Sequence, residues 1–280
     1  MNYYIMPSIS LAAEKIGSIA GFSITNSLLA TWLVMASLFL FAWAATRNLS
    51  LIPSGLQSMA ELLVGGLYDF FSSVAGHHIK RFFPLVASIF LFVILANWMG
   101  LLPGFGTVGF HHTKKDAVVE KTLSPEITEN GNEGPVVGSG TEEKKEETEF
   151  VPLLRGATAD LNTTLALAIV AVIAIQYFGF RVLGVQYGSK FINFKDPIFF
   201  GLGILELISE ISRVISFAFR LFGNIFAGEV LLAVMAFLMP FIVPLPFLMM
   251  ELFVGFIQAL VFSMLTAVFL NLAVSHGDEH

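Results

Sequence analysis

The sequence predicts an all-α integral membrane protein with five transmembrane helices, an interfacial amphipathic helix, and a long, steeply tilted hairpin made by the last two spans. Two observations indicate this class. The 280 residues are 56% hydrophobic and only 13% charged, a balance outside that of ordinary soluble domains. The apolar residues are gathered in runs of about 20, the length that crosses ~30 Å of hydrocarbon. Cysteine is absent, which excludes a disulfide framework, a thiol nucleophile and a thiolate metal site.

Three spans are continuous apolar runs, and we expect them at residues 28–45, 82–102 and 161–180. A further apolar stretch begins at residue 205 and is interrupted by MPFIVPLP, whose three prolines remove backbone donors and favour a break. We therefore expect two helices there, 205–239 and 247–272, joined by a turn. The first would be about 52 Å long at ~1.5 Å per residue, so it must tilt steeply, kink or protrude.

Residues 54–80, between the first two spans, have the pattern of an amphipathic helix. Apolar side chains recur there at helical spacing, with Glu61 and Asp69 on other faces. The apolar positions are Leu56, Met59, Leu63, Leu67, Phe70 and Val74. This pattern favours a helix that lies in the membrane interface, although a helix packed against the bundle would show the same pattern.

The segment 111–150 divides the chain into an N-terminal part, 1–110, and a C-terminal part, 151–280. Residues 111–149 hold ten acidic residues and five lysines. Stretches such as GSGTEEKKEETE cannot bury enough apolar surface to fold alone, so we expect a flexible acidic loop on the outer side of the membrane. His111 and His112 lie beside lysines and are interpreted as solvated, so no metal site is predicted.

Basic residues near the span ends predict the orientation of the chain. In a five-span topology one group of them falls on one side, and the acidic loop falls on the other. The group is Arg47, Lys80, Arg81, Arg181, Lys190 and Lys195. That side is expected to be cytoplasmic, with the N-terminus outside and the C-terminus inside, although Lys114, Lys115 and Arg155 weaken the bias. The first residues lack the basic start and cleavage site of a signal peptide, so none is expected to be removed.

The span 205–239 carries polar side chains at intervals of three or four residues, which places them along one helix face. They are Glu206, Ser209, Arg213, Ser216, Arg220 and Asn224. Such a stripe is typical of the wall of a water path or of a contact with another subunit. A polar seam that joins helices within the bundle is the alternative.

Arg220 lies far from either end of this span, within the sequence FAFRLFGNIFAGE. A guanidinium cannot lose its proton to escape burial, and a charge at this depth costs at least ~2.5 kcal/mol. No acidic residue stands three or four positions away, and Glu229 is nine residues on, about half a turn out of phase. The counter-charge of Arg220 must therefore come from elsewhere.

An antiparallel hairpin with its turn near Pro240 sets Arg220 level with Gln258 and Glu229 level with Glu251. Glu251 and Gln258 are seven residues apart, so they share a helix face. A carboxylate layer is thus expected near the turn, and an arginine and glutamine layer deeper in the span. Two carboxylates at one depth repel each other when both are ionised, which suits a proton-accepting station. Na⁺ coordination and a purely structural role are the alternatives.

These residues lie in motifs that resemble subunit a of F-type ATP synthases. The stretch FRLFGNIFAGEV and, after the prolines, ELFVGFIQALVFSMLTAVFL carry the resemblance, while ANWMGLLPGFG and TADLNTTLALA support it. The resemblance covers the chain from residue 80 onward, apart from residues 111–149, and extends more weakly to the first span. Many relatives have one acid and one histidine where this chain has Glu229 and Glu251.

The resemblance implies a stator subunit that carries protons through two offset aqueous half-channels to and from the carboxylates of a rotating c-ring. Arg220 matches the family's essential arginine, which attracts a ring carboxylate and blocks a direct proton leak between the half-channels. The residues that match the outer half-channel are Asn224, Glu229, Glu251 and Gln258, and those that match the inner half-channel are Glu206, Ser209 and Ser216.

The resemblance also implies partners and a location. The expected partners are the c-ring, peripheral-stalk b subunits and membrane lipid, with no nucleic acid, cofactor or metal. The chain is not expected to be an enzyme by itself, because it has no phosphate-binding G-x-x-x-x-G-K-[ST] motif and the ATP chemistry then belongs to other subunits. The expected location is a bacterial plasma membrane, and an organelle inner membrane is the alternative.

Two other classes of protein compete with this interpretation. An ion-coupled secondary transporter would usually show internal repeats with paired broken helices, and no second copy of the arginine helix occurs in the sequence. A structural membrane anchor would not require Arg220, Glu229 and Glu251 at intramembrane depth.

Overall fold

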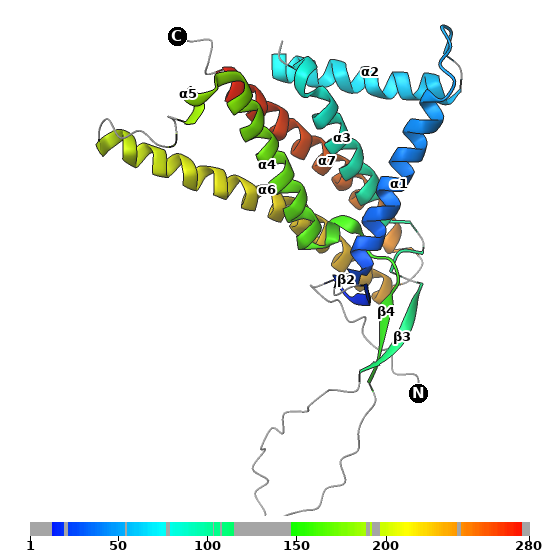
Figure 1. Cartoon of the computed structure of the whole chain (residues 1–280). Coiled ribbons are helices and arrows are strands. Elements are labelled where there is room, and N and C mark those ends of the chain that lie inside the picture. The colour runs from blue at the N-terminus through cyan, green and yellow to red at the C-terminus, as the bar shows by residue number, and fades with distance from the viewer. Residues whose placement is uncertain are drawn as a thin grey trace, which may run out of the picture.

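The computed structural model describes residues 13–19, 22–53, 55–76, 79–102, 104–106, 108–114, 147–188, 191, 197–239 and 242–275. Within them, five helices are long and apolar enough to cross a membrane, as the sequence predicts (Figure 1). They are α1 (Asn26–Thr46), α3 (Ile79–Gly100), α4 (Leu161–Leu183), α6 (Pro197–Leu238) and α7 (Pro244–Ser275). The all-helical membrane fold is thereby confirmed.

Shorter elements connect these spans. Helix α2 (Leu56–Ala75) joins α1 to α3, the 3-10 turn η2 (Ala157–Ala159) precedes α4, and α5 (Val185–Gly188) follows it. Two antiparallel hairpins, which the sequence analysis did not predict, pair β1 (Lys15–Ile19) with β2 (Phe22–Thr25) and β3 (Gly109–Lys114) with β4 (Glu147–Pro152). The two ends of the acidic segment are therefore paired strands, and its residues 115–146 lie outside the described part.

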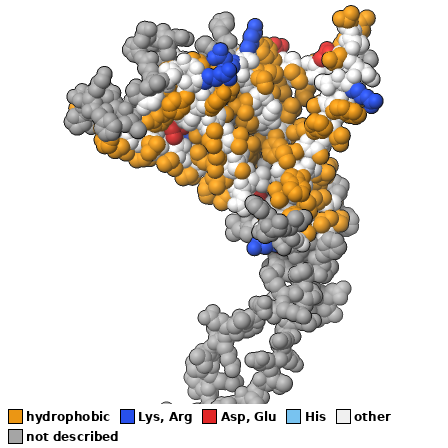
Figure 2. All heavy atoms as spheres, in the orientation of Figure 1, with side chains coloured by type: hydrophobic (Ala, Val, Ile, Leu, Met, Phe, Trp, Pro, Cys, Tyr) orange, Lys and Arg blue, Asp and Glu red, His pale blue; other side chains and the backbone are white. Residues whose placement is uncertain are grey.

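The bundle has two chemically different ends. One end holds α2, the start of α3 and the ends of α4 and α7, while the other holds η2, the β-hairpins and the α6–α7 turn (Figure 1). Arg47, Lys80, Arg81 and Arg181 belong to the first end, as predicted, whereas Lys190 and Lys195 lie outside the described residues. On the face in Figure 2, Lys and Arg side chains gather mostly at that end, and hydrophobic side chains cover the surface between the ends.

Helix α3 forms the centre of the packing. Its apolar side chains Phe82, Val86 and Val93 are fully buried. Phe90 of α3 makes edge-to-face contacts with Phe71 of α2 and Phe256 of α7, at ring-centroid distances of 6.3 and 6.2 Å. The core therefore ties α2 and α7 to α3, and α2 lies across the end of the bundle (Figure 1).

The α6–α7 hairpin has the predicted register. The rings of Phe217 and Phe262 lie 5.0 Å apart between centroids, and Gly228 of α6 lies against Glu251 of α7. Helix α6 begins eight residues earlier than expected and contains 42 residues, about 63 Å at ~1.5 Å per residue. Its N-terminal half extends obliquely away from the other helices in Figure 1, so a large part of its surface is left uncovered by this chain.

Candidate functional site

Arg220 lies on the uncovered face of α6. Its side chain is exposed, and its Nη2 atom is 3.4 Å from the hydroxyl of Ser216. Within the described residues, no carboxylate forms an ion pair with it. Its neighbours on this face include Ile215 and Phe219, which are 50% and 54% exposed. A permanent cation thus stands in a largely apolar surface without a counter-charge from the described part of its own chain.

Small residues surround this arginine. Ser216, Gly223 and Ala227 are exposed on the same side of α6, at helical spacing from Arg220. A Cβ atom added to Gly223 would meet no atom within 4 Å. This face therefore leaves room for a partner helix to approach the guanidinium closely.

A cavity of about 500 Å³ lies near the α6–α7 turn. Its polar lining comes from four elements, with Asn97 on α3, Thr158 on η2, Glu229 on α6 and Glu251 on α7. At ~30 Å³ per water molecule in the liquid, the cavity has room for a chain of several waters. The two carboxylates that the register placed at one level therefore face one polar cavity.

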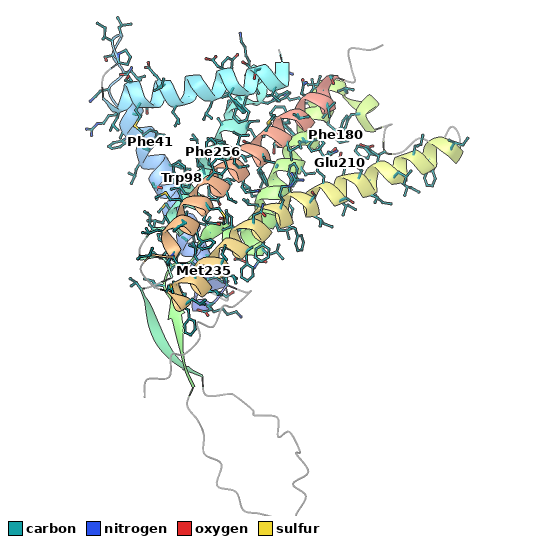
Figure 3. The ribbon with its side chains drawn as sticks, turned by 180° about the vertical axis from the view of Figure 1, so that it is seen from behind. Phe41, Trp98, Phe180, Glu210, Met235 and Phe256 are labelled. Atoms are coloured by element: carbon teal, nitrogen blue, oxygen red, sulfur yellow. The ribbon has the colours of Figure 1, made fainter. Side chains whose placement is uncertain are left out.

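Asn97 holds the walls of this cavity together. Its side-chain nitrogen donates a hydrogen bond to the carbonyl of Gly255 at 2.9 Å, and its side-chain oxygen accepts one from the Thr158 hydroxyl at 2.7 Å. The indole N–H of Trp98 donates to the carbonyl of Leu252 at 3.1 Å. These bonds join α3, α7 and η2, and Trp98 lies near Phe256 where α3 and α7 meet (Figure 3).

Glu251 is deeply buried in α7, with 4% of the residue exposed. Its carboxylate packs against the backbone of Gly228, where an added Cβ would overlap it. Its Oε1 atom accepts no hydrogen bond from any described residue. A buried polar atom without a partner is unusual and indicates a position served by water, an ion or a proton.

Glu229 has a partner that the sequence analysis did not name. Arg155, in the segment between β4 and η2, donates from Nε and Nη2 to the same carboxylate oxygen, Oε2, at 3.2 and 3.1 Å. Arg155 is buried, with 7% of the residue exposed, and its guanidinium lies 5.8 Å from the ring centroid of Phe226. This side chain fixes the C-terminal half of α6 to the chain segment before α4.

A second polar cluster lies near the other end of the bundle. Glu210 and Arg213, one turn apart on α6, form an ion pair at 2.7 Å, and the Arg213 guanidinium lies 4.0 Å from the ring centroid of Phe269. Together with Tyr187 they line a cavity of about 120 Å³. Figure 3 shows Glu210 on the side of α6 that faces α4, in the region of Phe180.

Comparison of the sequence with known proteins identifies the family of this chain. A family model described as ATP synthase A chain matches residues 28–271, which is most of the chain. The chain belongs to that family. The resemblance seen in the sequence is thereby confirmed.

Individual relatives agree with the family assignment. ATP synthase subunit a 1 of Pelobacter propionicus is 35% identical over 244 residues, which cover 86% of this chain and 84% of the relative. ATP synthase subunit a of Citrifermentans bemidjiense is 33% identical over 250 residues, 88% of this chain and 86% of the relative. ATP synthase subunit a of Gloeobacter violaceus is 34% identical over 260 residues, which cover 91% of this chain and 86% of the relative. Membership supports a role in ATP synthesis and proton transport for this multi-pass membrane protein.

In this member of the ATP synthase A chain family, the structure brings together some predicted site residues and separates others. Glu229 and Glu251 line one cavity, whereas Asn224 and Gln258 are not among its lining residues. Asn224 is exposed on α6, and Gln258 is half-buried on α7.

The residues expected in the inner path lie N-terminal to Arg220 on α6. Ser209 and Ser216 are exposed, and Glu206 is half-buried. The small cavity at this end is lined instead by Glu210 and Arg213, one turn from these positions.

Several site residues were missed by sequence reasoning. Asn97 and Thr158 lie inside the motifs ANWMGLLPGFG and TADLNTTLALA, so a polar residue within a motif was a usable signal. Glu210 stands three residues before Arg213, at ion-pair spacing. Arg155 had no local signal, because its partner Glu229 is 74 residues away.

Proposed function

We propose that the chain is the stator subunit a of a rotary F-type ATP synthase and carries protons to and from the carboxylates of a c-ring. The observation that carries this proposal is Arg220, an exposed cation on an apolar helix face without a counter-charge from the described residues of its own chain. A permanent cation at membrane depth needs an anion, and a ring carboxylate that moves past α6 would supply it. The small residues around Arg220 support this contact, because they let a second helix come near.

The outer half-channel of this proposal is the cavity that holds Asn97, Thr158, Glu229 and Glu251. Its polar lining and its position next to the α6–α7 turn suit a water path that opens at that end of the bundle. Glu229 lies nine residues beyond Arg220, about 13 Å along the helix at ~1.5 Å per residue. Asn224 and Gln258 would continue the path from this cavity toward the ring.

The inner half-channel would run along the other half of α6, past Glu206, Ser209 and Ser216. Ser209 precedes Arg220 by 11 residues, about 16 Å along the helix at ~1.5 Å per residue. The two sets of polar residues thus lie on opposite sides of Arg220 along α6, so a proton cannot cross at one place. It must travel on a ring carboxylate while the ring turns, and Arg220 blocks the direct route.

Energy coupling follows from this arrangement. A ring carboxylate is held ionised beside Arg220, takes a proton on one side, enters lipid in neutral form and gives the proton up on the other side. Each proton that crosses the membrane potential supplies about 2.3 kcal/mol per 100 mV. The chain makes and breaks no covalent bond in ATP, which leaves that chemistry to other subunits of the complex.

We further propose that the complex lies in a bacterial plasma membrane, with the N-terminus outside and the C-terminus in the cytoplasm. The basic residues Arg47, Lys80, Arg81 and Arg181 at one end of the bundle support this orientation. In this arrangement the chain is divided into an N-terminal part, 1–110, an acidic outer loop, 111–150, and a proton-channel part, 151–280. Peripheral-stalk b subunits hold the chain against the torque of the ring.

Arg220→Ala tests the proposal in membrane vesicles that carry the assembled complex. We expect ATP-driven proton pumping to be abolished while passive proton leak is retained or rises, because the barrier between the half-channels is removed. Arg47→Gln is the matched control, since this exposed arginine stacks on Trp43 at 5.0 Å, far along the chain from the site. Assembly is checked in every sample. Near-normal pumping by Arg220→Ala would return this arginine to a structural role.

A further inference from the structure

We propose that Arg155 is a positioning residue of the outer cavity: it holds Glu229 in a salt bridge and leaves Glu251 as the carboxylate that takes up and releases the proton. This inference rests on the proposed function, because it divides the work within the entry path between two acidic side chains. The observation that supports it is that Glu229 and Glu251 line the same cavity but have different surroundings.

Arg155 is built into the fold as an anchor. Its side chain is 8% exposed, its Nε and Nη2 atoms reach one oxygen of Glu229, and its guanidinium approaches the face of Phe226. Phe226 and Glu229 stand three residues apart on α6, so both contacts fix the same turn of that helix. Arginine keeps its charge at any working pH, which makes the salt bridge a permanent constraint.

Glu229 is therefore committed to a structural contact. A carboxylate that accepts two charge-assisted hydrogen bonds on one oxygen must lose both favourable contacts before that oxygen binds a proton. Removal of the arginine would leave an uncompensated charge beside the cavity, which costs more than the removal of both partners together.

Glu251 has the opposite surroundings. Its Oε1 atom is buried and without a hydrogen-bond donor among the described residues, and Gly228 provides the space that its carboxylate fills. The other polar groups that line the cavity are uncharged, apart from Glu229, and the nearby Asn97 and Thr158 already bond to each other. Glu251 thus lines the cavity with a carboxylate that can take a proton at Oε1 without losing a hydrogen bond to a described residue.

The step itself moves one proton. A hydronium ion in the cavity transfers a proton to a Glu251 oxygen and becomes water, and the carboxylate forms again when the proton passes onward to the ring carboxylate. Arg155 and Glu229 take no proton in this step and fix the shape and the charge of the cavity.

ATP-driven proton pumping in vesicles that carry the assembled complex tests this division. We expect Glu251→Gln to abolish pumping, and Arg155→Gln to lower it about tenfold, because breaking one side of a buried ion pair is strongly unfavourable. The double variant Arg155→Gln with Glu229→Gln should recover to within about threefold of the unmodified rate, because neither charge is then left alone. Arg155→Lys should keep most of the activity by preserving the charge.

The pH profile of pumping separates a positioning role from a purely structural one. The charged groups around Glu251 in the described part are Glu229 on α6 and Arg155 before η2, while α3 and η2 contribute the uncharged Asn97 and Thr158. Arg155→Gln should move the profile, and Arg155→Lys should leave it in place. An Arg155→Gln profile that keeps its position while its amplitude falls would overturn the proposal.

Two further results would also overturn it. A double variant as inactive as Glu251→Gln would identify Glu229 as a proton carrier, and near-normal pumping by Glu251→Gln would remove the assigned role of that carboxylate. Both results leave the rotary function intact as long as Arg220→Ala abolishes pumping in the same membranes. Failure of the proposed function itself would be seen in Arg220→Ala, independently of these variants.

Discussion

Two arginines of this chain have opposite environments and therefore different expected roles. Arg155 is buried and paired with Glu229, so its charge is compensated within the chain. Arg220 is exposed on α6, and its guanidinium lies 3.4 Å from the neutral hydroxyl of Ser216. The first arrangement fixes a helix, and the second leaves a charge available to another subunit.

Gly228 is the residue that lets Glu251 reach its position. Any Cβ at 228 would overlap the carboxylate of Glu251. The glycine therefore allows α6 and α7 to meet around a polar side chain at the edge of the cavity.

We predict that Gly228→Ala impairs the subunit through this overlap. The carboxylate of Glu251 must move or α7 must shift, and overpacking of this kind costs about 1–3 kcal/mol. Proton pumping should fall, and the purified complex should lose this subunit at a lower temperature. Gly65→Ala on α2 is the control, because an added Cβ there meets no atom within 4 Å. Equal pumping and thermal stability for both variants would show that the contact is not needed.

At the scale of the elements, α5 fixes the end of α4 through one aromatic ring. Tyr187 of α5 covers Gly179 of α4, where a side chain would overlap the ring, and its hydroxyl donates to the Gln176 side chain at 3.0 Å. Burial, with a smaller contribution from Glu210, raises the pKa of Tyr187 to about 12 from an ordinary value of 10.0.

We predict that Tyr187 stays protonated where ordinary tyrosines ionise. Because its pKa is raised in the folded state, its contribution to stability is fully present below pH ~10 and is lost as the pH rises toward 12. The ultraviolet difference titration of the unmodified chain against Tyr187→Phe should show this ionisation near pH 12. The variant should also lose about 1 kcal/mol with the hydrogen bond. A difference signal centred near pH 10 would contradict the buried environment.

In the molecule as a whole, the basic end of the bundle and the end that holds the cavity lie on opposite sides of the apolar surface (Figures 1 and 2). Leu51 lies at the basic end, fully exposed, and Val108 lies at the other end, 60% exposed. The absence of cysteine from the chain means that a single introduced thiol is unique.

We predict that Leu51→Cys reacts with a membrane-impermeant thiol reagent from the cytoplasmic side and Val108→Cys from the outer side. Intact cells should label only the second variant, and inverted vesicles only the first. The physical reason is that Arg47, Lys80, Arg81 and Arg181 lie at the same end of the bundle as Leu51, and an excess of basic residues is expected on the cytoplasmic side. The reverse labelling would place the proposed entry cavity on the cytoplasmic side.

Sequence patterns were sufficient to predict the five spans, the α6–α7 register and the polar stripe that contains Arg220. These follow from local properties, namely the length of an apolar run, the spacing of residues on a helix and the position of prolines. Register alone was enough to set Glu229 and Glu251 at one level. The full length of α6 was underestimated, because the segment PIFFGLGI before residue 205 contains a proline and two glycines, which weaken a helix prediction although the start of this helix tolerates them.

The surroundings of those two carboxylates, in contrast, could be seen only in the folded chain. The Arg155–Glu229 pair, the Asn97–Thr158 bond and the Asn97–Gly255 bond join residues 74, 61 and 158 positions apart. Helical periodicity fixes neighbours within a turn or two and says nothing about such pairs, which depend on how whole helices pack. The strands β3 and β4 were not predicted for a related reason. Each is a short segment whose backbone N–H and C=O groups pair with a strand that is distant in the sequence.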